Sequence, residues 1–230
     1  MFKQAYLYFI LLMIILVIGF WPSYFSQLEQ QHSFARHFHS IIMLIWCLLL
    51  ISQAWLMRSK NFPVHKQAGR MAFIIGPLVI ASAVYVAFDF VGRITPPYPP
   101  GLLSIHWFGL FLAALFAFLF TNAIYYRKTP ALHARYMIAT AFVFLMPGFG
   151  RAVRRLFIAF ESEAPSLFSL MFVPLILMLI LVFMDLRKKQ NARPFIYLTL
   201  AWGANMILYK ALPHMPWWTD FTLWCHELMT

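Results

Sequence analysis

The sequence predicts an all-α fold, a polytopic membrane helix bundle of about seven transmembrane helices. Charged residues make up only 11% of the 230 residues, against roughly 25% in an ordinary soluble domain. Hydrophobic residues reach 63% and fall in runs near the ~20 residues that a helix needs to cross a bilayer. The net charge of +11 resides in the turns between these runs, where basic residues set membrane orientation. We therefore expect the lipid bilayer, and no nucleic acid, as partner.

Seven apolar stretches, joined by short connections, carry this prediction. The first follows a single Lys3 and resembles a signal-peptide core, but it lacks a small-x-small cleavage pattern, so we expect a retained helix. Residues 213–230, which contain three tryptophans, are expected to lie at the membrane interface. The predicted spans are 4–21, 38–57, 69–91, 102–126, 132–148, 167–186 and 195–212.

Basic residues are divided unequally between the two sides of the predicted membrane. Twelve lie on the side of the N-terminus and six on the other. This bias places the N-terminus inside and, after seven crossings, the C-terminus outside. Asp185 is then the only acidic residue inside. We expect an integral protein of a bacterial inner membrane.

Four histidines open four consecutive predicted spans: His39, His65, His106 and His133. The first two are 26 residues apart and the last two 27, and each pair encloses an apolar span and a basic turn, which indicates a weak internal duplication. An ionisable residue at membrane depth is a functional hypothesis by default. In a bundle, His39 and His106 would meet near the outer surface, and His65 and His133 near the inner one.

Paired histidines on facing helices are the ligand set that six-coordinate haem iron requires. His37 points about 200° away from His39 on a helix. We choose His39 as the ligand because it shares a face with Trp46 and Gln53. Small residues on the same face as two of the histidines either leave room for a flat cofactor or serve close helix packing. They are Gly69, Ala72 and Gly76 after His65, and Gly109, Ala113 and Ala117 after His106.

About half of the chain, from His37 to Met146, resembles the transmembrane cytochrome b561 family. The resemblance rests on VH at 64–65, VAFDF at 86–90, LSIHWFG at 103–109 and LH at 132–133. It implies two b-type haems, held by His39 with His106 and by His65 with His133, and electron transfer across the membrane to an acceptor such as a quinone. The turn HKQAGR at 65–70 also resembles several uncharacterised bacterial multi-pass membrane proteins. Residues 1–230 are expected to form one membrane domain, with a histidine-bearing core at 31–150 and peripheral helices at 1–30 and 151–230.

Two alternatives stay open. The first is a metal-dependent membrane enzyme with an outward-facing site of His37, His39, Asp89 and His106, because histidine with carboxylate suits zinc or another divalent metal. The second is a non-catalytic transporter or partner subunit in which the histidines are incidental. A separate group of arginines is a candidate anion-binding site, or a set of side chains that extend to the surface and pair with Glu161 and Glu163. Its members are Arg151, Arg154 and Arg155.

Overall fold

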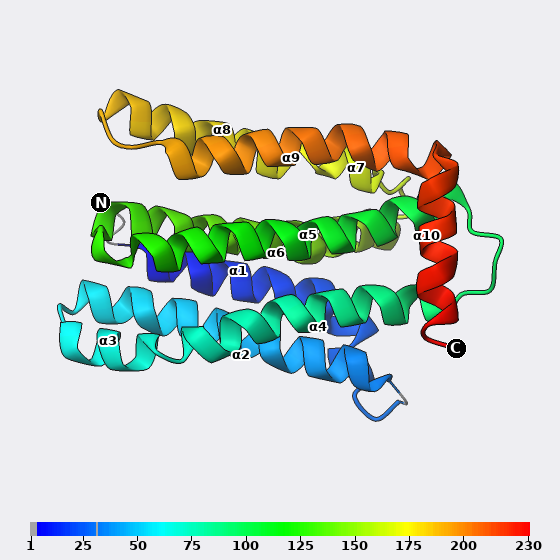
Figure 1. Cartoon of the computed structure of the whole chain (residues 1–230), viewed down its shortest axis with the longest axis horizontal. Coiled ribbons are helices and arrows are strands. Elements are labelled where there is room, and N and C mark those ends of the chain that lie inside the picture. The colour runs from blue at the N-terminus through cyan, green and yellow to red at the C-terminus, as the bar shows by residue number, and fades with distance from the viewer. Residues whose placement is uncertain (1–3, 31) are drawn as a thin grey trace.

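The computed structural model describes residues 4–30 and 32–230, and these residues form an all-helical bundle (Figure 1). Among them, seven helices are long and apolar enough to cross a membrane, and no strand occurs. The predicted fold class is therefore confirmed. Lys3, which counts toward the orientation bias, and Gln31, the first residue of the predicted core, lie outside the described residues.

The long helices match the predicted spans closely, with one large difference. The fifth span continues through Pro147 to Ala159, about three turns past its predicted end. The bounds are α1 Ala5–Phe20, η1 Trp21–Ser23, η2 Phe25–Gln27, α2 Phe34–Arg58, α3 Phe62–Gly69, α4 Ala72–Gly92, α5 Pro100–Tyr125, η3 Tyr126–Lys128, α6 Pro130–Ala159, α7 Leu167–Leu170, α8 Phe172–Arg187, α9 Arg193–Ala211, η4 Leu212–His214 and α10 Pro216–Glu227.

The predicted fifth span includes Pro147 and ends at Gly148, and two glycines explain why the helix continues beyond this point. A Cβ at Gly19 of α1 would collide with the carbonyl of Gly148 of α6, and a Cβ at Gly148 would press on Leu16. Glycine at both positions therefore lets α1 and α6 approach closely, as small residues do in membrane bundles. Gly148 is a packing residue inside a continuous helix.

Local signals account for most helix starts. Proline occupies the first turn of α5, α6, α9 and α10, where its missing N–H has no intrahelical partner to lose. Ser33 caps α2 by accepting a hydrogen bond from the Arg36 backbone N–H. Asn61 caps α3 in the same way, with Val64 as donor. The first basic turn therefore contains a short helix, α3, which carries His65.

Five helices close into a ring. Consecutive neighbours around it are α1, α2, α4, α5 and α6, and α6 packs back on α1. The first span thus forms one wall of the bundle, between two histidine-bearing helices. Outside the ring, α9 packs against α5 and α6, and α8 packs mainly on α9. The last helix, α10, lies across the ends of α4 and α5 (Figure 1).

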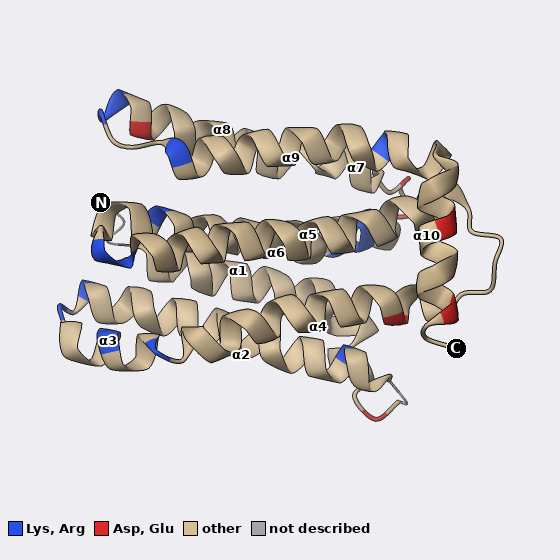
Figure 2. Ribbon diagram, in the orientation of Figure 1, with Lys and Arg blue, Asp and Glu red and all other residues tan. Residues whose placement is uncertain are grey.

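Charge separates along the bundle (Figure 2). We call one end the basic end, because its turns hold most lysines and arginines, in residues 58–70, 127–135 and 187–193. The other is the acidic end, with Glu29, Asp89, Glu161, Glu163, Asp220 and Glu227. The N-terminal helix begins at the basic end and the chain finishes at the acidic end, as an odd number of crossings requires.

Aromatic side chains fill the middle of the ring. Trp46 of α2 is fully buried and meets Phe116 and Phe120 of α5 edge-on, at ring-centroid distances of 5.1 and 5.6 Å. Phe116 also contacts Phe144 of α6 at 5.5 Å. We call these four residues the aromatic layer. It separates the histidines near the basic end from those near the acidic end.

Candidate functional site

The basic end brings His65 and His133 close together. His133 stands in the first turns of α6, and its Nδ1 lies 2.8 Å from the backbone carbonyl of Ala123 on α5. Since a carbonyl only accepts, Nδ1 of His133 carries the proton and donates it to this bond. A neutral ring then leaves Nε2 as an acceptor or ligand atom, which is the usual arrangement of a metal-binding histidine.

His65 approaches the same end from α3. Burial lowers the pKa of the His65 imidazole, the charge of His133 lowers it further, and a backbone group of Gln53 acts in the opposite direction. The ring is therefore held in its neutral form. Its Nδ1 is buried and has no hydrogen-bond partner among the described residues. The Nε2 of Gln53, on α2, is likewise buried without a partner. We call Gln53, His65 and His133 the inner polar cluster.

At the acidic end, His39 and His106 have different neighbours. Nδ1 of His39 lies 3.1 Å from the Ser82 hydroxyl on α4. Nδ1 of His106 lies 3.0 Å from the Thr222 hydroxyl on α10, and the ring stacks on Phe221 with an interplanar angle of 6°. His106 is only 1% exposed, and its Nε2 has no hydrogen-bond partner in the described chain.

The two acidic-end histidines also differ in depth. Ser33 at the start of α2 bonds Asp89 of α4 at 2.9 Å, and His39 lies six residues further along α2, beside Ser82. His106 lies three residues before Gly109, which packs against Ala87 and so keeps His106 near the level of Asp89. At a rise of 1.5 Å per residue, His39 and His106 are offset by about 10 Å along the bundle.

Two glycines of the predicted small-residue stripes, Gly76 and Gly109, pack against neighbouring helices. A Cβ at Gly76 would collide with the ring of Phe120, and one at Gly109 would touch Ala87. These glycines serve close packing of α4 and α5. Haem ligation by His39 with His106, and by His65 with His133, stays a prediction, and the electrostatic interaction of His65 with His133 places the second pair near one another at the basic end.

The residues of the alternative metal site lie apart. His37 bonds the Tyr24 hydroxyl at 3.0 Å, and Asp89 forms an ion pair with Arg93 at 2.7 Å, the i,i+4 pair that the sequence predicts. His39 and His106 have the separate partners given above. Within residues 4–30 and 32–230, no group of three or more histidine, cysteine, aspartate or glutamate side chains is placed to hold a metal ion.

The arginine group at the end of α6 contacts carbonyls and an aromatic ring. Arg151 donates to the Pro147 carbonyl at 2.9 Å and lies 4.4 Å above the Phe20 ring. Arg154 donates to the Pro165 carbonyl at 2.7 Å. These contacts tie the helix end to neighbouring segments. Anion binding by Arg151, Arg154 and Arg155 stays a prediction.

A buried ion pair was not anticipated from the sequence. Arg135 of α6 forms two bonds to Asp185 of α8, at 2.6 and 3.0 Å, and both residues are only 1% exposed. The available signal was Asp185 itself, because a lone acid that ends an apolar span needs a buried cation nearby. Arg135 lies in the second turn of α6, within the predicted fifth span.

Comparisons with known protein families, with curated proteins and with solved structures found no match, so the side-chain arrangement is the basis for assigning a function.

Proposed function

We propose that the chain is an integral membrane electron carrier with one b-type haem at the basic end, held by His65 and His133. The observation that carries the proposal is the hydrogen bond from His133 Nδ1 to the Ala123 carbonyl, which fixes the ring and leaves Nε2 free near a second histidine, His65. Hydrogen bonds of this kind orient histidines that ligate a metal. When bound, the haem would supply a one-electron centre.

The chain's own residues would supply ligation and surroundings. His133 of α6 is hydrogen-bonded to α5, and His65 belongs to α3, which follows α2. A group held by both histidines would therefore connect these two parts of the helix ring at its basic end. Gln53 places a buried amide nitrogen with no partner in the described chain beside them, which is available as a donor to a bound group. The aromatic layer closes the deeper side with apolar rings. The donor, and an acceptor such as a quinone, stay predictions.

The test is haem content after expression with ample haem supply, followed by purification and a reduced-minus-oxidised spectrum. We expect about one haem per chain and a Soret band. His133→Ala and His65→Ala should each remove most of the haem, because each deletes one axial ligand. His39→Ala and His106→Ala are matched controls and should retain it.

Two outcomes of this experiment would contradict the proposal of a single haem. Two haems per chain, with half lost in His106→Ala, would restore the two-haem arrangement that the family resemblance implies. Wild-type protein that is folded and colourless would reject the electron-carrier function. Circular dichroism and gel filtration of every variant establish that a loss of haem is not a loss of fold.

A further inference from the structure

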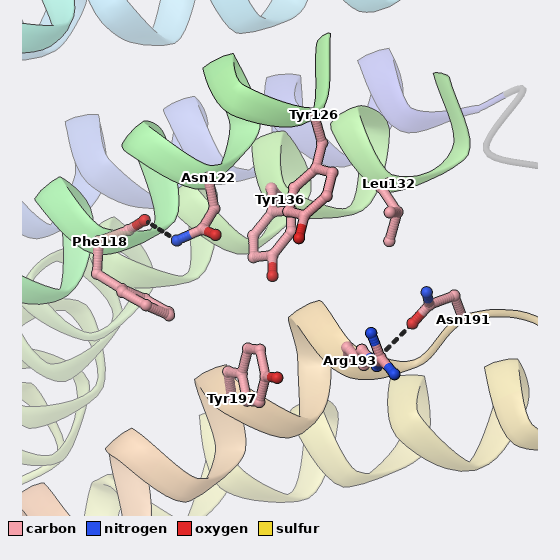
Figure 3. Close-up of a pocket in the computed structure, with 8 residues that line it drawn as sticks. All are labelled: Phe118, Asn122, Tyr126, Leu132, Tyr136, Asn191, Arg193 and Tyr197. Carbon is pink, nitrogen blue, oxygen red and sulfur yellow. Dashed lines mark hydrogen bonds between the residues drawn. The ribbon is translucent and has the colours of Figure 1, made fainter. Parts of the chain in front are cut away.

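A cleft of about 390 Å³ opens at the basic end, between the end of α5, the start of α6 and the start of α9 (Figure 3). No residue of the inner polar cluster lines it. Its walls are partly apolar and partly polar. The lining residues are Phe118, Asn122, Tyr126, Leu132, Tyr136, Asn191, Arg193 and Tyr197.

Hydrogen-bond donors dominate the polar part. Arg193 supplies a guanidinium, and three tyrosines supply hydroxyls that converge on the same space (Figure 3). Asn191 is turned toward the chain itself, because its Oδ1 accepts from the Arg193 backbone N–H at 3.1 Å. No lining residue is acidic. Asp185, the acid of this end, is neutralised by Arg135.

Tyr136 indicates that the cleft is built for a ligand. The residue is only 2% exposed and stacks on Tyr126 with ring centroids 5.6 Å apart. Its hydroxyl points into the cleft, with Arg193 and Tyr197 as electrostatic neighbours (Figure 3). A tyrosine hydroxyl held in this position by a buried, stacked ring can donate a hydrogen bond to a ligand oxygen in the cleft.

The cleft lies where a lipid headgroup would lie. Arg193 begins one membrane-spanning helix, and Tyr126 belongs to the last turn of another. Tyrosine and arginine concentrate at this level of membrane proteins. Phe118 and Leu132 extend the apolar wall, and the surrounding turns carry Arg127, Lys128, Arg187, Lys188 and Lys189, which give the region a positive potential.

We infer that this cleft binds the phosphate group of an anionic glycerophospholipid. The Arg193 guanidinium faces a phosphate oxygen, the tyrosine hydroxyls donate to the remaining oxygens, and the glycerol and first methylenes lie along Phe118 and Leu132. Arginine suits phosphate because its planar fork forms two parallel bonds. A cleft of this size holds a headgroup but not whole acyl chains, so the chains stay in the bilayer.

The experiment titrates delipidated full-length protein with phosphatidylglycerol or phosphatidylcholine and counts bound lipid by native mass spectrometry. One phosphatidylglycerol should bind in preference to phosphatidylcholine. Arg193→Gln should weaken it roughly tenfold, the size of one lost charge-assisted hydrogen bond. Tyr136→Phe should weaken it several-fold with the aromatic stacking kept. Lys189→Gln, which removes the same charge from a residue outside the cleft, should leave the affinity within about twofold.

Competition distinguishes lipid from a soluble phosphate ester. Millimolar glycerol 3-phosphate or inorganic phosphate should not displace the lipid, because neither contacts the apolar wall. Displacement at lipid-like affinity would overturn the lipid assignment in favour of a soluble ester. Equal effects of Arg193→Gln and Lys189→Gln would overturn the cleft as the site. Colourless, haem-free protein can be used, so this result is independent of the proposed electron transfer.

Discussion

Asp185→Asn should destabilise the protein strongly, because it leaves Arg135 charged and buried without its counter-ion. Arg135 Nε and an Nη atom bond the two carboxylate oxygens at 2.6 and 3.0 Å, and each residue is 1% exposed. Arg135 also donates to the Gln190 side-chain oxygen at 3.4 Å and to the Ala131 carbonyl at 2.8 Å. These neutral acceptors cannot replace the lost charge.

The magnitude follows from burial. Removing one partner of a buried, well-formed ion pair costs about 3–5 kcal/mol, whereas exposed pairs contribute about 0–1 kcal/mol. We expect the free energy of unfolding to fall by about 3 kcal/mol in Asp185→Asn, because the amide still accepts one hydrogen bond. The double variant Arg135→Met with Asp185→Leu should lie close to wild type, since it removes both desolvated charges.

Reversible unfolding in mixed micelles, followed by tryptophan fluorescence, measures these differences. Asp220→Asn on α10 is the matched control, because Asp220 is exposed, and it should change stability by less than about 0.5 kcal/mol. The buried-pair reasoning is refuted if Asp185→Asn matches this control, or if the double variant is as unstable as the single one.

Two further predictions concern orientation and pH. An impermeant thiol reagent applied to intact cells should label Thr219→Cys at the acidic end and not Ser59→Cys at the basic end; the reverse pattern would invert the proposed topology. Burial lowers the pKa of His65 below 6.5, so its contribution to stability is complete above that pH and is lost as the pH falls through the folded-state pKa. His65→Gln should flatten this part of the curve of unfolding free energy against pH; an unchanged slope would mean that His65 titrates freely.

The seven spans could be predicted from the sequence because each one is an apolar run long enough to cross a membrane. The charged residues in the turns also predicted two chemically distinct ends of the bundle. Trp46 was assigned to an inner face by its seven-residue spacing from His39, and it is fully buried. The predicted end of the fifth span at Gly148 was wrong. A proline followed by a glycine is compatible both with a loop and with a close crossing of two helices, so the sequence alone does not distinguish them. The collision that Gly148 avoids depends on α1, more than a hundred residues away.

The role of α10 required the structure. Residues 213–230 are predicted to lie at the membrane interface, which stays a prediction; the structure adds that α10 lies across the ends of α4 and α5 and buries Trp218, Thr222 and Cys225. These residues are spaced as i, i+4 and i+7, which is the signature of one buried helical face. That spacing was a usable signal. The sequence analysis paired His106, which bonds Thr222 of α10, with His39. It did so because the repeat in the sequence does not distinguish the four histidines from one another.

Equal spacing in the sequence therefore produces unequal sites. His106 lies within α5 and reaches the underside of α10, where Thr222 bonds its Nδ1. His65 belongs to the separate helix α3, outside the membrane-spanning segments, and this lets it turn toward His133 and away from the aromatic layer. A helix added at the acidic end thus takes one histidine out of a symmetrical pairing, while the basic end keeps His65 and His133 close together, beside a buried amide nitrogen with no partner among the described residues. A ligand that needs both histidines of one predicted pair is therefore expected at the basic end.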